Sequence, residues 1–179
     1  MDGKALQEQL NKTLPGAVLA LTDRFGVPEL LLAPAKWADA VRALKEDPAS
    51  SMDMLVDLVA VDYSEYPGHE GGRFGLLAHL KSLRRGHRVT LKCLLPDDDP
   101  SVATLTGLYR NANFLEREAW DQMGIRFAGH PNLKRLLNHH EFVGHALRKD
   151  YPLKKRQWLS ANESLMDEME VKLRERGWA

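Results

Sequence analysis

The feature that most constrains the fold of this chain is a long segment, from Arg126 to Arg156, that has the pattern of neither a helix nor a strand. It contains several glycines and two X-Pro steps, at Pro131 and Pro152, which favour turns and irregular backbone. An irregular segment of this length is uncommon inside a compact domain and is usually functional or interfacial. We therefore expect the regular elements of the domain to lie before it.

The same segment is locally basic. The whole chain has 25 Lys and Arg residues against 25 Asp and Glu residues, so its formal net charge is zero. This balance argues against a general binder of nucleic acid or anionic membranes, because such proteins are usually basic overall. The segment has only two acids, Glu141 and Asp150, so its bases predict a surface that suits an acidic partner. These bases are Arg126, Lys134, Arg135, Arg148, Lys149, Lys154, Lys155 and Arg156.

The composition is that of an ordinary soluble protein. A chain of 179 residues, 44% hydrophobic and 28% charged, fits one domain with a modest extension. Its single cysteine, Cys93, excludes an intrachain disulfide framework and a four-thiolate iron–sulfur site within this chain alone. No apolar run approaches the roughly 18 residues of a membrane span, and the polar N-terminus is unlike a signal peptide. We expect a soluble, cytoplasmic chain that is at most peripheral to a membrane.

Apolar periodicity before residue 125 predicts both helices and strands. From Met54 to Val61, both the odd-numbered and the even-numbered residues are apolar, apart from Asp57. This pattern is typical of a central strand buried on both faces. Asp99 suits an N-cap with Pro100 at the first helical position, so we expect a helix to begin there. The other expected elements are a helix over residues 4–14, a hairpin of strands 17–22 and 27–32, a helix from Pro34 to Asp47, and a hairpin of strands 74–80 and 89–95.

Two further helices are expected, one on each side of the basic segment. Over residues 113–123, apolar residues recur at steps of three and four, and Gly124 suits the left-handed residue that ends a helix. Beyond the segment, Ser160 to Glu163 has a capping-box pattern, and a narrow apolar stripe follows that needs a surface to pack on. The stripe consists of Leu165, Met169 and Leu173.

These elements predict an α+β fold. We expect a mixed or antiparallel sheet of about four to five strands with helices packed on one face, plus an extended C-terminal loop and helix. The expected organisation is an α+β domain over residues 1–125, an extended basic interaction segment over 126–159, and a C-terminal helical tail over 160–179.

Charged residues on the helix before the basic segment are candidates for a structural role. Helical geometry places Glu116 at the edge of the apolar arc, with Arg117 and Asp121 together on the opposite side as an i,i+4 pair. A carboxylate on the packed side must find a cation or hydrogen-bond donors, because burying it alone is unfavourable. Arg135 and Arg148–Lys149 are the nearest cations, so a salt-bridged lock of the fold is expected.

Chemical roles for these residues are less favoured. Acid–base catalysis by Glu116 or Glu118 would need a nucleophile or electrophile beside them, and the pattern has none. The histidines match no standard zinc spacing, and adjacent residues such as His139 and His140 are typical of a solvated loop. The histidines concerned are His130, His139, His140 and His145. Cys93 is in phase with the apolar residues of its strand and is expected in the core.

The basic segment is better explained as a protein interface than as a nucleic-acid site. Arginines and aromatic residues beside irregular backbone are typical of interface hot spots. Nucleic-acid binding would call for aromatics interleaved on a sheet face or a known motif, and neither is present. A solvated loop with scattered Lys and Arg is the alternative. The aromatic residues are Phe142, Tyr151 and Trp158.

Two sequence blocks carry a specific resemblance. Residues 116–121 read ERExxD and are followed over 124–137 by GIxFxGHPxLKRLL, while residues 144–153 read GHxLRKDYPL. Together they resemble the signature of the C subunit of proton-pumping NADH:quinone oxidoreductase, respiratory complex I (NDH-1), of the prokaryotic type. The resemblance covers roughly residues 17–156.

The resemblance implies a non-catalytic structural subunit of the peripheral arm, on the cytoplasmic face of the cell membrane. Such a complex passes electrons from NADH through FMN and iron–sulfur clusters to quinone, coupled to proton translocation. These cofactors are implied in partner chains, and no catalytic, cofactor-binding or metal-binding residue is expected in this chain. The implied neighbours are the D subunit, which contains the quinone site, and the iron–sulfur B and I subunits. The implied structural and interface motif consists of Glu116, Arg117, Glu118, Asp121, His130, Lys134, Arg135, His145, Arg148, Lys149, Asp150 and Tyr151.

Other assemblies remain open on the sequence. A membrane-bound hydrogenase or formate hydrogenlyase-type complex has an equivalent subunit, and a free-standing binding module or a stand-alone enzyme are the remaining alternatives. If the chain belongs to complex I, Arg135, Arg148 and Lys149 are expected to hold the loop and partner acids. Charge reversal at Arg148 would then release the chain from the complex without unfolding it.

Overall fold

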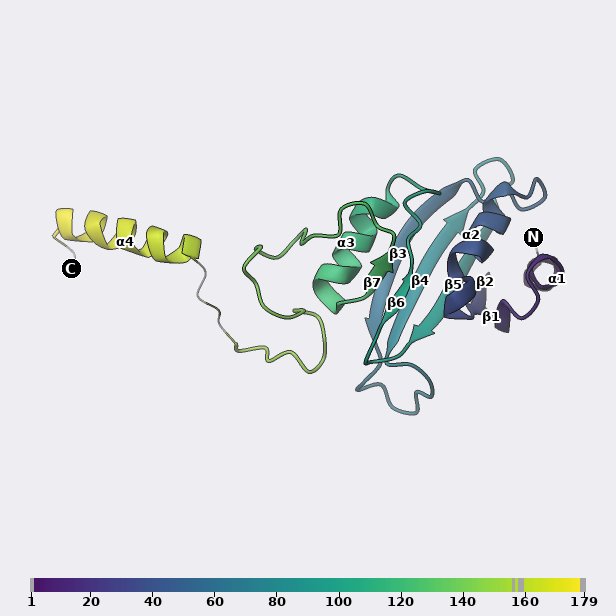
Figure 1. Cartoon of the computed structure of the whole chain (residues 1–179), viewed down its shortest axis with the longest axis horizontal. Coiled ribbons are helices and arrows are strands. Elements are labelled where there is room, and N and C mark those ends of the chain that lie inside the picture. The colour runs from purple at the N-terminus through teal and green to yellow at the C-terminus, as the bar shows by residue number, and fades with distance from the viewer. Residues whose placement is uncertain (1, 156, 158–159, 178–179) are drawn as a thin grey trace.

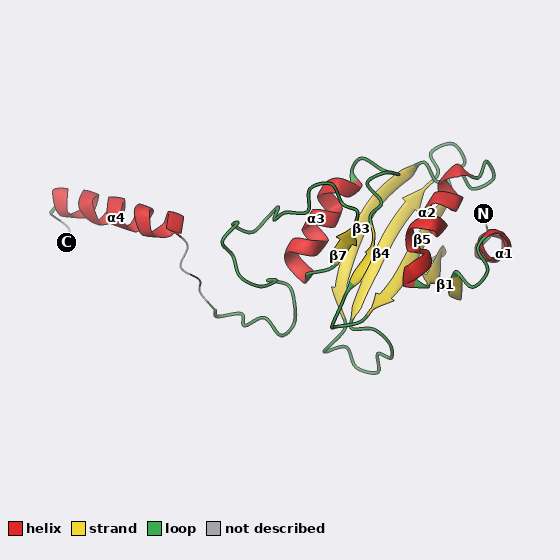
Figure 2. Cartoon of the chain, viewed as in Figure 1, coloured by secondary structure: helices red, strands yellow, loops and turns green. Residues whose placement is uncertain are grey.

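The computed structural model describes residues 2–155, 157 and 160–177. Its central element is a five-stranded sheet in the order β1-β2-β5-β4-β3, drawn as one layer in Figure 2. β2 and β5 are parallel, and the other neighbouring strands are antiparallel. The strands are β1 (Val18–Arg24), β2 (Val27–Leu32), β3 (Met54–Asp62), β4 (Phe74–Lys81) and β5 (Arg88–Leu95).

Figure 1 shows how the helices lie around this sheet, and residues of α1, α2 and α3 share one hydrophobic cluster with its inward side chains. A short parallel pair of strands, β6 (Ser101–Ala103) and β7 (Arg126–Ala128), completes the domain. The predicted α+β fold with a mixed sheet is therefore confirmed. The helices are α1 (Gly3–Thr13), the short 3-10 helix η1 (Pro34–Lys36), α2 (Trp37–Glu46), α3 (Ala112–Met123) and, beyond the domain, α4 (Ser160–Glu175).

The core explains why these segments form these elements. Alternate residues of β4 and β5 face the helices and are fully buried, among them Leu76, Ala78 and Leu91. Complete burial of a side chain such as Leu44 of α2 contributes about 1.5–3 kcal/mol to stability. Burial also raises the pKa of the Cys93 thiol to about 12, so Cys93 is the core residue that its position in the strand predicts.

The prediction of a central strand over residues 54–61 was wrong, because β3 is an edge strand. A register shift between Leu55 and Asp57 interrupts the alternation of its side chains, and three of its apolar residues are exposed: Met54 by 40%, Val56 by 48% and Val59 by 37%. The sequence is apolar on both faces because one face packs on the helices while the other forms an uncovered apolar surface. A pattern of apolar residues alone does not separate these two situations.

The prediction of a helix beginning at Asp99–Pro100 was also wrong. Residues 101–103 form β6, which pairs in parallel with β7, and the backbone N–H of Arg126 donates to the carbonyl of Pro100 at 2.8 Å. The Asp99 carboxylate pairs with the Arg126 guanidinium and does not cap a helix. A distant pairing therefore overrides a local capping pattern, and it also places a short strand at the start of the basic segment.

Helix α4 lies well apart from the sheet in Figure 1. Its predicted stripe is exposed, with Leu165 and Met169 each 56% exposed and Leu173 38% exposed. The Ser160 hydroxyl donates to the carboxylate of Glu141. The side chain of Glu163, the partner expected in a capping box, lies outside the described residues, as do Arg156 and Trp158. Every helix in the part of the chain that the structure describes is too short or too polar to cross a membrane.

Candidate functional site

The residues of the two sequence blocks gather where α3 meets residues 129–151, which we call the motif loop. The loop has no helix or strand of its own, so its shape depends on side chains that bind its backbone groups. Many of these side chains come from α3, which packs against the edge strand β3. The site is therefore an irregular surface segment supported by one helix and one end of the sheet.

Asp121 organises the first half of the motif loop. Its carboxylate is completely buried and accepts the backbone N–H groups of Leu136, Leu137 and Asn138 at 3.0, 2.8 and 2.8 Å. The Arg135 guanidinium donates to it at 2.6 Å. Burial opposes ionisation, but the hydrogen bonds from Asn138 and Arg135 outweigh it and lower the pKa of Asp121 to about 2. Asp121 is therefore a permanently charged anchor for three consecutive peptide groups.

Two arginines bind the loop's carbonyl groups. Arg117 donates from Nε to the Lys134 carbonyl at 3.0 Å and from Nη2 to the Arg135 carbonyl at 2.8 Å. Arg135 donates from Nη2 to the Gly144 carbonyl at 2.9 Å, which links the two halves of the loop. Arg117 and Asp121 were expected to pair with each other, but both are buried under the loop and bind its backbone. The loop covers the polar side of α3, and helix periodicity cannot predict a cover made of backbone groups.

The second half of the loop caps the C-terminal end of α3. The Arg148 Nε donates to the Met123 carbonyl at 2.7 Å, and the His145 Nδ1–H donates to the Asp121 carbonyl at 3.1 Å. Cations are favourable at this end of a helix, where carbonyl groups lack helical partners. Burial lowers the pKa of His145, so its ring is neutral at pH 7. Gly124 ends the helix with a φ of +79°, as predicted.

A second anchor lies at the end of the sheet. Asp62 accepts two hydrogen bonds from Arg73, at 3.1 and 2.9 Å, and the backbone N–H of Lys149 at 2.9 Å. Arg73 also pairs with Asp97 and with Asp150 of the loop, each at 3.0 Å. Burial opposes ionisation of Asp62, but the Arg73 hydrogen bonds outweigh it and hold its pKa well below the usual range. This one guanidinium therefore joins three carboxylates from separate parts of the chain.

Glu116 makes a different kind of buried contact. The Thr104 hydroxyl and the Leu105 N–H each donate to its carboxylate at 2.5 Å. The predicted cations, Arg135 and Arg148–Lys149, do not reach it. Burial dominates and raises the pKa of Glu116 to about 7, because uncharged donors only partly compensate the loss of water. Glu116 therefore fixes mainly the connection from β6 to α3.

His130 lies beside Glu116, with 4.0 Å between its Nε2 and the carboxylate. Its Nδ1 accepts the N–H of Asn132 at 3.0 Å, so Nε2 carries the proton and donates to the Asn113 carbonyl at 3.2 Å. Both ring nitrogens thus hold the turn at the start of the loop. No group of three metal-binding side chains occurs among the described residues, and His139 and His140 lie together at the surface.

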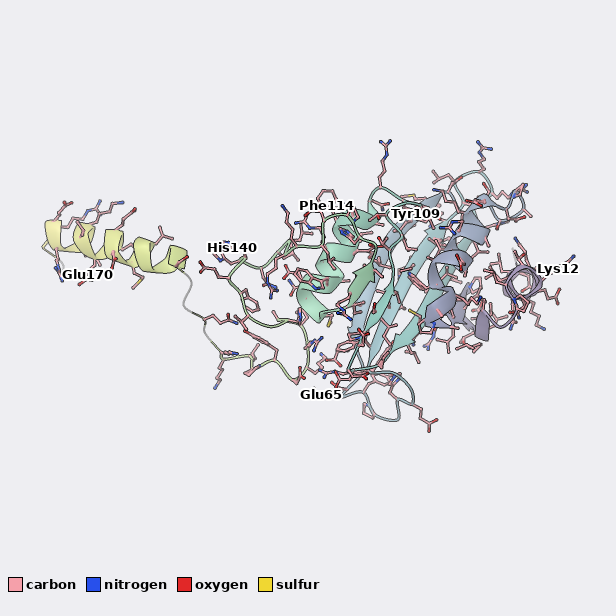
Figure 3. All side chains as sticks on the ribbon, in the orientation of Figure 1. Lys12, Glu65, Tyr109, Phe114, His140 and Glu170 are labelled. Carbon is pink, nitrogen blue, oxygen red and sulfur yellow. The ribbon has the colours of Figure 1, made fainter. Side chains whose placement is uncertain are left out.

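The remaining motif residues face outward. Four lysines of the basic segment, which we call the outer lysines, have exposed side chains: Lys134 and Lys149 in the motif, and Lys154 and Lys155 just after the motif loop. Glu118 is exposed on α3, and Phe114 lies one turn before it with 58% of its surface exposed (Figure 3). Tyr151 packs on Phe142, with ring centroids 5.6 Å apart, and its hydroxyl accepts from Gln157 at 2.6 Å. The motif therefore has an inner set that shapes the loop and an outer set that is free to contact other molecules.

Sequence reasoning missed Arg73 and Thr104. Arg73 lies far along the chain from Asp150, its partner in the loop, and stands in a polar stretch without periodicity. Thr104 directly follows β6, where the sequence predicted a helix, so its contact with Glu116 was not expected. The only sequence indication was that a carboxylate on the packed side of the helix, such as Glu116, needs donors.

Comparison with known proteins identifies the family. Residues 30–157 match the model of the family described as "Respiratory-chain NADH dehydrogenase, 30 Kd subunit". The chain belongs to this family. The match includes the whole motif loop and ends before α4.

Curated relatives of this 30 Kd subunit are named as the C subunit of NADH-quinone oxidoreductase. The chain is 40% identical over 153 residues to that of Thiobacillus denitrificans, covering 84% of this chain and 76% of the relative. It is 44% identical over 151 residues to that of Verminephrobacter eiseniae, covering 83% and 74%. The predicted resemblance to the C subunit is confirmed.

Two solved structures share the fold of this family member. A trypsin-resistant fragment of Nqo5, residues 1–134, is 32% identical with a TM-score of 0.62, covering 73% of this chain and 97% of the fragment. A chain of the membrane-bound sulfane sulfur reductase, an archaeal respiratory membrane complex, has a TM-score of 0.66 and covers 92% of this chain and 91% of its own. At 23% identity the second structure indicates the fold alone.

Proposed function

We propose that this chain is a structural subunit of the peripheral arm of a proton-pumping NADH:quinone oxidoreductase. Its membership of the 30 Kd subunit family, with relatives named as the C subunit at 37–44% identity, carries this proposal. The complex would pass electrons from NADH through FMN and iron–sulfur clusters to quinone. Those groups would be held by partner chains, and this chain would supply no catalytic residue.

The motif loop is the surface that we propose to bind the partners. The inner set, with Asp121, Arg117 and Arg135, fixes the shape of the loop before any partner is present. A loop held in its bound shape binds more tightly, because less conformational entropy is lost on association. The outer lysines would then meet acidic groups of neighbouring subunits, which steers association and fixes its register.

The neighbours would be the quinone-site D subunit and the iron–sulfur B and I subunits, on the cytoplasmic side of the membrane. The local charge supports an acidic partner surface. Glu141 and Asp150 are the only acids between residues 126 and 156, the segment that contains the outer lysines. Asp150 is already paired with Arg73, and Glu141 is bonded to Ser160. Most of the positive charge of the outer lysines is therefore available to a partner.

Purification of the tagged chain in mild detergent, with mass spectrometry of the proteins that accompany it, tests the assembly. Flavin- and NADH-binding subunits together with cluster proteins and membrane subunits are the expected result. Hydrogenase or formate dehydrogenase subunits would assign the chain to the related complexes. Recovery of the chain alone would contradict the proposal.

A charge-reversal variant tests the loop. Replacing Lys149, Lys154 and Lys155 by Glu should abolish recovery of the complex and leave the thermal unfolding of the isolated chain unchanged, because these side chains are exposed. A control with equal charge change replaces the exposed Lys4, Lys12 and Lys36 by Glu, and it should assemble normally. Normal assembly of the loop variant would contradict the assignment of this surface.

Arg148 is not suited to this test, although the sequence favoured it. Its guanidinium binds the end of α3 and lies 4.9 Å from the centre of the Phe74 ring, so the side chain points into the domain. We expect Arg148→Glu to loosen the motif loop in the isolated chain. Any failure to assemble would then follow from a disordered loop and would not identify a contact.

A further inference from the structure

The face of the sheet that the helices leave uncovered is hollowed. Side chains of β4 and β5 alternate, so Leu77, His79, Thr90 and Lys92 lie opposite the buried residues that pack on the helices. Together with β2 and β3, they line a groove of about 960 Å³, which we call the open groove. No residue of the motif loop lines it. The open groove is thus a second surface, separate from the proposed partner site.

An aromatic wall closes one end of the open groove. Tyr63 lies directly on β4 at Gly75, where a Cβ atom would come within 2.5 Å of its ring. Its ring stacks on His69 with 4.2 Å between centroids, and the Lys92 ammonium lies 4.7 Å from its centre. Gly75 is therefore required for this wall, and the wall places an aromatic face and a cation side by side.

The charge of the open groove is positive. Its lining includes four strong bases and two acids. One base, Arg24, is paired with one acid, Glu29, at 3.8 Å. Lys81, Arg88 and Lys92 form no ion pair within the part of the chain that the structure describes. Three cations therefore remain against the single carboxylate of Asp57.

The groove is also bordered by an apolar strip. Met54 and Val56 of β3 line it and are 40% and 48% exposed, and Leu77 of β4 lines it too. Apolar side chains in a row on an open sheet are unfavourable in water, and such patches usually mark interaction sites. A surface that combines an apolar strip with unpaired cations matches a partner segment with one apolar side and carboxylates beside it.

We propose that the open groove binds an acidic, amphipathic segment of a neighbouring protein in the same assembly. The apolar side of that segment would cover Met54, Val56 and Leu77, and its carboxylates would meet Lys81, Arg88 and Lys92. A second copy of this chain is a poor occupant in face-to-face symmetry, because it would place one positively charged groove against another. The proposal rests on the proposed function only in that the chain must belong to a complex.

Cysteine labelling tests the groove directly, because the one native cysteine, Cys93, is fully buried. Val56→Cys should react with a charged maleimide in the isolated chain and lose that reactivity in the purified complex. Glu8→Cys, on the exposed side of α1, is the control and should react in both. Equal reactivity of Val56→Cys in the isolated chain and in an intact complex would overturn the proposal, without affecting the proposed function.

A photo-crosslinking residue in place of Val56, in the intact complex, identifies the occupant. We expect a crosslink to one segment of another subunit that has more acids than bases. Crosslinks to lipid, or to α4 of this chain, would overturn the proposal. Lys81→Glu with Arg88→Glu should restore the labelling of Val56→Cys in the complex, whereas Lys81→Arg with Arg88→Lys should not. Continued protection in the double reversal would show that charge does not select the occupant and would also overturn it.

Discussion

Glu116 and Asp121 stand on the same helix, are both fully buried, and have pKa values displaced in opposite directions. The difference comes from their donors. Asp121 is bound by a guanidinium and three backbone N–H groups, which favour the charged form. Glu116 has one hydroxyl and one N–H, which do not offset the loss of water. The two carboxyl groups therefore contribute to stability in different pH ranges.

Glu116 should make the chain less stable as pH rises. Its pKa is raised from 4.5 to about 7, so its contribution is fully present below pH 4.5 and is lost as pH rises through about 7. The shift corresponds to about 3 kcal/mol of unfolding free energy. Glu116→Gln keeps the acceptor for Leu105 and does not titrate. Its stability relative to the native chain should therefore increase as pH rises from about 5 to about 8. Urea unfolding at these two pH values measures this. An equal difference at both would contradict the prediction.

The contribution of Asp121 to stability should have the opposite pH dependence. Its pKa is lowered from 3.8 to about 2, so its contribution is present above pH 3.8 and is lost as pH falls through about 2. We expect Asp121→Asn to lower the unfolding free energy at pH 7 by about 2–4 kcal/mol, because it leaves the largely buried Arg135 side chain, 14% exposed, without its charge partner. The loss, measured by urea unfolding, should shrink near pH 3. Glu118→Gln, at an exposed position of the same helix, is the control and should change little.

Residues of the site could be predicted only where both partners belong to one local pattern. The i,i+4 spacing of α3 brought Arg117 and Asp121 to the same side of the helix, as they are, but Asp121 is bonded at 2.6 Å to Arg135, which had been expected to pair with Glu116. Arg73 could not be predicted, because its partners Asp62, Asp97 and Asp150 come from three distant parts of the chain. Glu116 was assigned charged partners because a sequence shows charges more plainly than it shows the hydroxyl and N–H donors of a neighbouring turn.

At the scale of elements, the junction between α3 and the motif loop depends on Gly124. Its φ of +79° disfavours other residues, and a Cβ atom would lie 2.7 Å from the His145 ring and closer still to the Arg148 guanidinium. Gly124→Ala should therefore cost about 1–2 kcal/mol for the backbone alone, and more for displacing both side chains. Gly107→Ala, where a Cβ atom meets nothing within 4 Å, is the matched control.

Unfolding free energies and limited proteolysis of both variants measure this effect. We expect new cleavage between residues 138 and 155 only in Gly124→Ala, because its loop loses the contacts at the end of α3. Equal protease resistance of the two variants would show that the loop holds without this junction.

Elements with strong local patterns were predictable, and those that depend on distant pairing were not. The β4–β5 hairpin follows from alternating apolar residues, and α3 follows from its periodicity and its glycine stop. β6 is three residues long and exists because β7 lies beside it, so the capping pattern at Asp99–Pro100 predicted the wrong element. The edge position of β3 depends on strand order, which no local pattern contains.

For the whole molecule, α4 should be dispensable for folding. Its described apolar side chains are all more than a third exposed, and none belongs to the hydrophobic cluster. We expect a chain ending at Gln157 to unfold within about 0.5 kcal/mol of the full chain, as exposed changes usually do. Denaturant unfolding of both chains measures this. A loss of stability well beyond that value would show that α4 packs on the domain in solution.

The contacts that hold the motif loop also impose an order of events on folding. Asp62, Arg73, Arg117 and Asp121 all precede the loop in the chain, and the bond from Lys149 to Asp62 spans 87 residues. Contacts of such long range form late, because the entropy of closing the intervening chain is lost before they are made. During synthesis the loop also emerges after α3 and the sheet, so the elements that receive it are already available. We therefore expect the motif loop to become ordered only late in folding, so that an incompletely folded molecule would lack the surface that we propose for partner binding.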